Sequence, residues 1–133
     1  HAAEWNATPL APGDYATAAS TLDRHAEAIG RDPGEIRRSM LLFAAIGPDQ
    51  HHADRALDRY LAMIAPVGGT MTLAAAEAAG RAPWRGSVEP LVDHCGRLGE
   101  LGLQEVVFDH LCADDDTIPR WLAEEIAPRL RGS

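Results

Sequence analysis

Two groups of residues that could do chemistry stand at the ends of predicted strands. Trp5 and Asn6 close a short amino-terminal strand, and Asp109 and His110 follow an apolar strand near the other end. Parallel α/β folds build their sites at the carboxyl ends of strands. Trp5 could line a pocket there, and Asp109 or His110 could act as an acid, a base or a polar anchor. Alternatively, Trp5 plugs the end of the sheet, and Asp109 and His110 are ordinary surface residues.

A third candidate is the pair Gly86 and Ser87, which precedes a predicted helix. The free backbone N–H groups of a helix N-terminus, together with the helix dipole, can hold a phosphate or another anion. Serine is also one of the preferred N-cap residues, and a simple cap explains Ser87 without any ligand.

Histidine and cysteine do not form a recognisable metal motif. The pairs His94-Cys95 and His110-x-Cys112 match no usual zinc spacing, so no metal site is predicted. Cys95 lies on an apolar helical stripe and should be protected, whereas Cys112 should be accessible in a loop. The acidic run 114–116 is interpreted as a solvated helix start, with a bound cation as the weaker alternative. Phosphate-loop, dinucleotide-binding and serine-hydrolase motifs are absent from the sequence.

Apolar strands alternating with amphipathic helices must position these residues. The segment 84–110 predicts a helix, a break at Gly102 and a strand, which together form the returning half of a βαβ unit. An earlier continuous apolar run, 39–46, has the pattern of a buried parallel strand. The other predicted helices start near Asp14, at Asp49 or Asp54, at Thr70 and at Ile118, and they end near Ile29, Ile64, Ala79 and Leu130. The fold class is therefore α/β, with a parallel sheet covered by helices.

The composition of the chain limits the kinds of partner that it is expected to bind. The chain has 133 residues, a net charge of -8 and 46% hydrophobic residues, which suits one domain, 1–133, with a real core. An acidic chain is not expected to bind nucleic acid, and no apolar run has the length of a membrane span. Two cysteines outside a CxxC motif, and no visible signal peptide, indicate a reduced, cytoplasmic protein.

Four stretches together resemble the carboxyl-terminal part of luciferase-like monooxygenases that use F420 or FMN. They are AAEWN at 2–6, LDRHAEAIGRDPGEIRRS at 22–39, RGSVEPLVDHCGRLGELGLQEVVFDH at 85–110 and WLAEEIAPRLR at 121–131. Pro90 departs from the family pattern by two positions, and 66–84 does not follow it. The resemblance implies the last strands of a (β/α)8 TIM barrel, with most flavin-binding and catalytic residues upstream, and the chain without an initiator Met would then be a fragment.

The resemblance favours an enzyme, the carboxyl-terminal part of a flavin- or F420-dependent oxidoreductase acting on a small-molecule substrate. The isolated chain is expected to be inactive and to bind neither F420 nor FMN tightly. The alternative is a non-catalytic α/β module that acts through assembly or ligand binding. A partial barrel leaves strand edges and apolar surface unpaired, so a homo-oligomer is also expected.

Overall fold

The computed structural model describes residues 2–110, 112 and 114–131. It is an α/β structure in which four strands form an open sheet, with β2 paired to each of the other three. The chain divides into two compact units, one made of residues 1–42 and 93–107 and the other of 43–92 and 108–133. Within the described part, no helix has the length and apolar character needed to cross a membrane.

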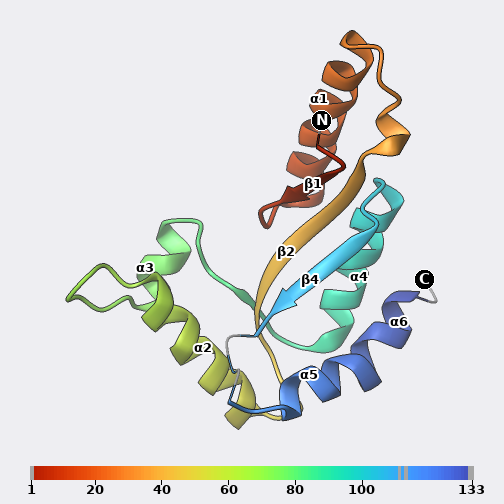
Figure 1. Ribbon diagram of the computed structural model, residues 1–133. Coiled ribbons are helices and arrows are strands. Elements are labelled where there is room, and N and C mark those ends of the chain that lie inside the picture. The colour runs from red at the N-terminus through yellow and green to blue at the C-terminus, as the bar shows by residue number, and fades with distance from the viewer. Residues whose placement is uncertain (1, 111, 113, 132–133) are drawn as a thin grey trace. The chain divides into compact units, whose positions relative to one another are not determined.

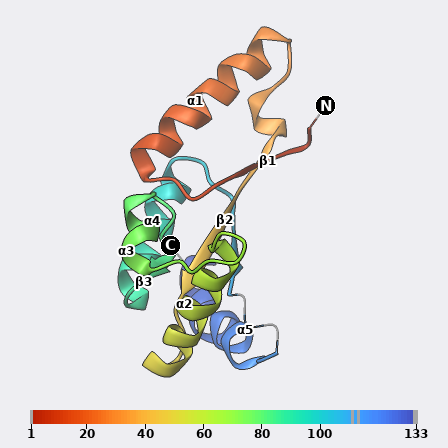
Figure 2. The same ribbon diagram turned by 90° about the vertical axis from the view of Figure 1, so that its left-hand side faces the viewer.

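The first unit is built on β1 (Glu4–Ala7) and the first half of β2 (Arg37–Ala45), which pair in parallel with Asn6 opposite Ser39. β4 (Glu105–Asp109) lies on β2 as well, and Gln104 N donates to Arg38 O at 2.9 Å. Helix α1 (Pro12–Ala28) lies alongside β1 (Figures 1 and 2). The predicted strands around 5 and 39–46 and the helix from Pro12 are confirmed.

One face of this sheet carries the core of the first unit. Its buried residues come from β1, β2, α1 and α4 (Val88–Glu100) and from the turn before β4; they are Ala7, Met40, Tyr15, Ala19, Leu98 and Leu103. Helix α4 ends through Gly102 at a φ of 93°, and Leu103 N donates to Leu98 O at 3.0 Å. The predicted glycine break is therefore confirmed, because glycine adopts this left-handed conformation without a Cβ clash. The predicted end of α1 near Ile29 is confirmed, and Ile29 itself is 70% exposed because it follows the last helical residue.

The second unit contains α2 (Gln50–Ile64), α3 (Leu73–Ala78), a two-residue strand β3 (Trp84–Arg85) and a carboxyl-terminal helical run. That run comprises α5 (Thr117–Trp121), a π-helical turn (Leu122–Ile126) and α6 (Ala127–Arg131). Asp49 caps α2 by accepting from His52 N at 3.0 Å, so the first of the two predicted starts is correct. Strand β3 pairs in parallel with the end of β2 and was not predicted.

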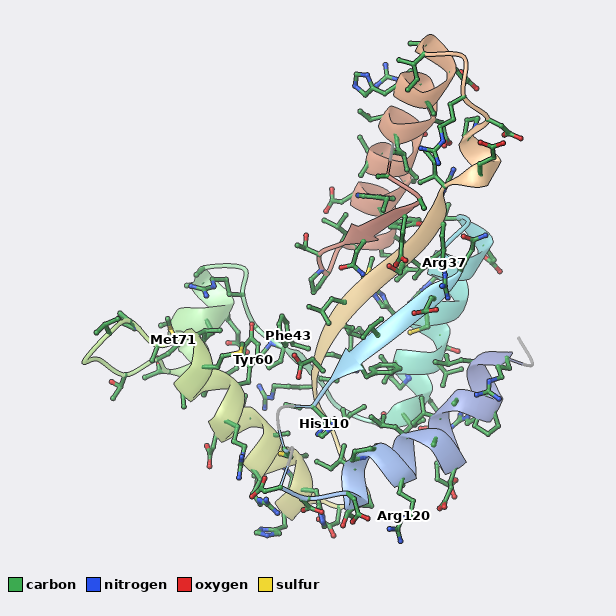
Figure 3. The ribbon with its side chains drawn as sticks, in the orientation of Figure 1. Arg37, Phe43, Tyr60, Met71, His110 and Arg120 are labelled. Atoms are coloured by element: carbon green, nitrogen blue, oxygen red, sulfur yellow. The ribbon has the colours of Figure 1, made fainter. Side chains whose placement is uncertain are left out.

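The core of the second unit joins the end of β2 to α2 and α5 through Ala45, Ala56 and Ile118. Cys112 lies in the same cluster and is 0% exposed. The prediction of an accessible Cys112 is therefore wrong, because its side chain is buried in the cluster that contains Ala56 of α2. Tyr60 of α2 packs against Phe43 (Figure 3). Their ring centroids are 5.2 Å apart, and the Tyr60 hydroxyl donates to Arg81 O at 2.5 Å.

The acidic run stands at a helix start, as predicted, with Asp114 and Asp116 exposed, and it also forms ion pairs that the sequence did not indicate. Asp115 accepts from Arg55 at 2.8 Å, and Asp114 accepts from Arg59 at 2.7 Å, so two carboxylates of the run are paired with α2. Hydrogen bonds from Thr117 and then the Arg55 guanidinium lower the pKa of Asp115 to about 2. The run therefore attaches the start of α5 to α2.

Tyr15 and Tyr60 provide a matched test of the two cores. The Tyr15 hydroxyl is buried and bonds to nothing within the described residues, and burial raises the pKa of its phenol. Tyr15→Phe should leave stability unchanged or raise it by up to about 1 kcal/mol, because it removes an unsatisfied polar group. Tyr60→Phe should cost about 1 kcal/mol, since it removes a made hydrogen bond. Urea unfolding measures both, and an equal loss in the two variants would contradict the assignment.

Asp115 should account for part of the stability that the protein loses at acid pH. Its folded-state pKa is depressed, so the stability it contributes is complete above the ordinary carboxyl value of 3.8 and disappears as the pH falls toward about 2. Asp115→Asn should lower the melting temperature near neutral pH and flatten its decline across that acid window. Circular dichroism melts at several pH values measure the slope, with Asp58→Asn on the exposed side of α2 as the control. Parallel profiles for Asp115→Asn and the wild type would refute the assignment.

Candidate functional site

The second unit contains a hollow of about 430 Å³ at the carboxyl ends of two parallel strands. Three segments form it: the end of β2, the first two turns of α2 and the link from β3 to α4. The lining residues are Ala45, Gln50, Ala53, Asp54, Leu57, Arg85, Gly86 and Ser87. Binding sites of parallel α/β folds occupy this position, because the loops that follow the strands converge there.

The position of the hollow follows from local backbone constraints. Register pairs Ala44 with Trp84 and Ala45 with Arg85, which brings the two strand ends to the same level. Gly47 then allows α2 to begin close to β2. A Cβ at Gly47 would lie 2.5 Å from the Cβ of His52, a distance that real Cβ atoms do not tolerate. Glycine at this position therefore sets how closely the first turn of α2 approaches the strand.

The polar groups of the hollow carry both signs of charge. On α2, Gln50 Nε2 donates to Asp54 Oδ1 at 2.7 Å. On β3, Arg85 Nη1 lies 3.6 Å from Glu77 Oε1, and the Arg85 side chain is 46% exposed. The lining also includes apolar side chains, of which Ala45 is buried and Leu57 is half-buried. Such a lining can hold a small molecule by hydrogen bonds, ion pairs and apolar contact.

The structure places the predicted residues Gly86 and Ser87 in the lining of this hollow, directly before Val88, where α4 begins. Gly86 has a φ of 117°, in the region that favours glycine, and no heavy atom lies within 4 Å of the position a Cβ would take. The predicted helix start is confirmed.

Trp5 and Asn6 belong to the first unit and point to opposite faces of β1. Trp5 stacks on Tyr15 with ring centroids 5.5 Å apart and packs against the core. Asn6 Nδ2 donates to Ser39 Oγ at 2.7 Å, and Ser39 in turn donates to Glu4. The structure therefore uses Trp5 in packing, whereas Asn6 belongs to a polar group on the other face.

Asp109 ends β4, and His110 follows it; both are half-buried (Figure 3 labels His110). His110 Nδ1 accepts from Cys112 N at 3.1 Å, so this nitrogen is the unprotonated one and only Nε2 can donate. Neither residue lines the hollow.

The remaining titratable candidates do not converge on a metal. Burial raises the pKa of Cys95 to about 11, so its thiol stays protonated at neutral pH. Burial, with Arg97 nearby, lowers the pKa of His94. Within residues 2–110, 112 and 114–131, no group of three or more His, Cys, Asp or Glu side chains is arranged to hold a metal ion.

Sequence reasoning missed Gln50, Asp54 and Arg85 as site residues. Gln50 and Asp54 follow Gly47-Pro48 and the cap Asp49, a sequence that places their helix directly after the end of a strand. The signal was present, but their relation to Arg85 depends on β3, which is too short to recognise by its pattern.

Comparison with known proteins adds little to this geometry. No protein-family model matches the chain, and no curated protein matches it. A solved structure of an F420-dependent secondary alcohol dehydrogenase, in complex with an F420-acetone adduct, is similar to it with a TM-score of 0.42 and 16% sequence identity. The match covers 87% of this chain and 47% of that protein, so the chain spans about half the length of this relative.

Two glycine substitutions test how the hollow is positioned. Gly47→Ala should destabilise the protein by about 1–3 kcal/mol, because the added methyl group would push the first turn of α2 away from β2. Gly99→Ala should stabilise it by about 0.5–1 kcal/mol, since Gly99 is exposed in α4 and a Cβ there meets nothing within 4 Å. Thermal unfolding compares the two, and a neutral Gly47→Ala would show that α2 does not approach β2 as described.

Proposed function

We propose that this chain is the carboxyl-terminal part of a luciferase-like (β/α)8 barrel whose complete form is an F420- or FMN-dependent oxidoreductase. The observation that carries the proposal is the uncovered face of the sheet in the first unit. Parallel sheets are ordinarily covered on both faces, and in a (β/α)8 barrel the inner face is filled by side chains from the other strands.

Exposure along the strands defines this face. Helices cover the face that carries Ala7 and Met40, whereas the opposite face presents Glu4, Asn6 and Arg37 to solvent. Side chains of the same face on β4 include Glu105, which pairs with Arg37, and Val107, which is 41% exposed. Such an exposed face is expected for a sheet whose remaining strands lie in another part of a longer protein.

The positions of the resembling stretches also support the proposal. The AAEWN stretch forms β1, the GRDP turn leads through a 3-10 turn (Pro33–Glu35) into β2, and the RGS stretch leads into α4. The positions of these three stretches on strands and at a helix start are consistent with the proposal.

In the complete protein, hydride would pass between the cofactor and a small-molecule substrate, and the cofactor would supply the redox chemistry. The residues of this chain fit one wall of such a site and not the whole of it. Asn6 is exposed on the uncovered face, but its amide donates to Ser39, whose hydroxyl is fully buried and also donates to Glu4. Trp5 is engaged with Tyr15, and the hollow in the second unit carries charged side chains. We therefore derive no catalytic step from this chain, and Trp5, Asn6, Gly86, Ser87, Asp109 and His110 remain candidates for supporting roles.

Association is part of the same proposal. The uncovered face combines the exposed side chains of Asn6 and Val107 with the half-buried Leu41, and a second copy could cover it. The chain is therefore expected to form a homo-oligomer when its missing strands are not supplied.

Cofactor binding tests the proposal. Expressed together with the in-frame coding sequence that precedes His1, the protein should bind F420 or FMN with a Kd of about 10 μM or tighter, and residues 1–133 alone should bind at least about a hundredfold more weakly. Fluorescence titration of each cofactor measures both constants, with FMN and F420 tested separately because the proposal does not choose between them. Equal, tight binding by the short chain, or no binding by the longer protein, would overturn the proposal.

A further inference from the structure

The hollow in the second unit is lined by side chains of opposite charge, and no function described above uses them. Asp54 comes from α2, Arg85 comes from β3, and apolar side chains form part of the same lining. We propose that this hollow is a binding site for a small zwitterion of the α-amino-acid class. The inference is independent of the proposed oxidoreductase function.

The α2 side supplies the anionic end of the site. Asp54 accepts one hydrogen bond, from Gln50 at 2.7 Å, and within the described residues it forms no ion pair. Two other carboxylates of this unit are paired with arginines of α2, Asp115 with Arg55 and Asp114 with Arg59. Asp54 therefore keeps an uncompensated negative charge and free acceptor capacity, which an ammonium group can satisfy.

The β3 side supplies the cationic end. The Arg85 guanidinium has five N–H donors in a planar fork that matches a carboxylate. Its contact with Glu77, through Nη1 at 3.6 Å, is longer than a normal hydrogen bond and leaves the fork available. Ser87, two residues further on, adds a hydroxyl to the same side of the lining.

The apolar part of the lining has small side chains at Ala45 and Ala53 and a larger one at Leu57. The volume of about 430 Å³ lies within the range of small-molecule sites. A simple anion would leave Asp54 unmatched and close to like charge, and a simple cation would do the same at Arg85. A ligand with a carboxylate, an ammonium group and an aliphatic side chain matches all three parts of the lining.

L-leucine is the probe, with two analogues that each lack one charged group. 4-Methylpentanoate has no ammonium group, and 3-methylbutylamine has no carboxylate. Isothermal titration calorimetry on the 133-residue protein should show saturable binding of leucine and binding at least about tenfold weaker for each analogue, because each loses one charge-assisted contact. Absence of saturable leucine binding, or equal binding of the three compounds, would overturn the proposal.

Substitutions then assign each end of the ligand. Asp54→Asn should abolish the preference for leucine over 4-methylpentanoate and keep the preference over 3-methylbutylamine, and Arg85→Gln should do the reverse. Such a cycle measures coupling between one side chain and one ligand group and is insensitive to general destabilisation. Asp58→Asn and Arg81→Gln make the same chemical changes at exposed residues outside the lining and should alter neither preference. If Asp54→Asn and Arg85→Gln weakened all three compounds equally, the charged groups would not contact the ligand, and the proposal would fail.

Discussion

The main-chain pairing of β2 is the constraint on which the rest of this structure depends. β2 pairs with β1, β3 and β4, and five of its nine residues are buried. A strand this apolar cannot remain in water, because its amides and carbonyls need partners and its side chains need cover. The first half of β2 meets these needs with β1, α1 and α4, and the last residues meet them with β3, α2 and α5.

The two halves of β2 lie in different units, and each unit supports a separate functional proposal. In the first unit the helices cover one sheet face only, and the polar group around Ser39 remains on the other. Ser39 is fully buried yet satisfied, since it accepts from Asn6 and donates to Glu4. In the second unit the end of β2 opens onto a hollow, because Ala45 and Ala53 are small and Gly47 brings α2 close. The oxidoreductase proposal rests on the first feature and the zwitterion site on the second, so either can fail alone.

The charged side chains of the second unit are of two kinds. Some form ion pairs within the protein, and others remain available to bind a ligand. Arg55 and Arg59 meet the carboxylates of Asp115 and Asp114, and the low pKa of Asp115 reflects how completely its charge is satisfied. Surface ion pairs of this kind contribute modestly to stability, so their main effect is to set where α5 begins relative to α2. Asp54 and Arg85 differ from these residues, because neighbouring side chains neutralise their charges less completely. Both also line the same hollow.

The sequence by itself determined the α/β class, the long helices, the buried strand around Met40 and the glycine break at Gly102, because hydrophobic periodicity and local caps act over a few residues. It also placed Gly86 and Ser87 at the start of α4. Only the tertiary structure decided that Cys112 is buried, that Arg55 meets Asp115 across sixty positions of the chain, and that Arg85 shares a hollow with Asp54. These outcomes depend on contacts between distant residues. The two-residue strand β3, whose pairing with β2 brings Arg85 to the hollow, is too short to leave a periodic signal.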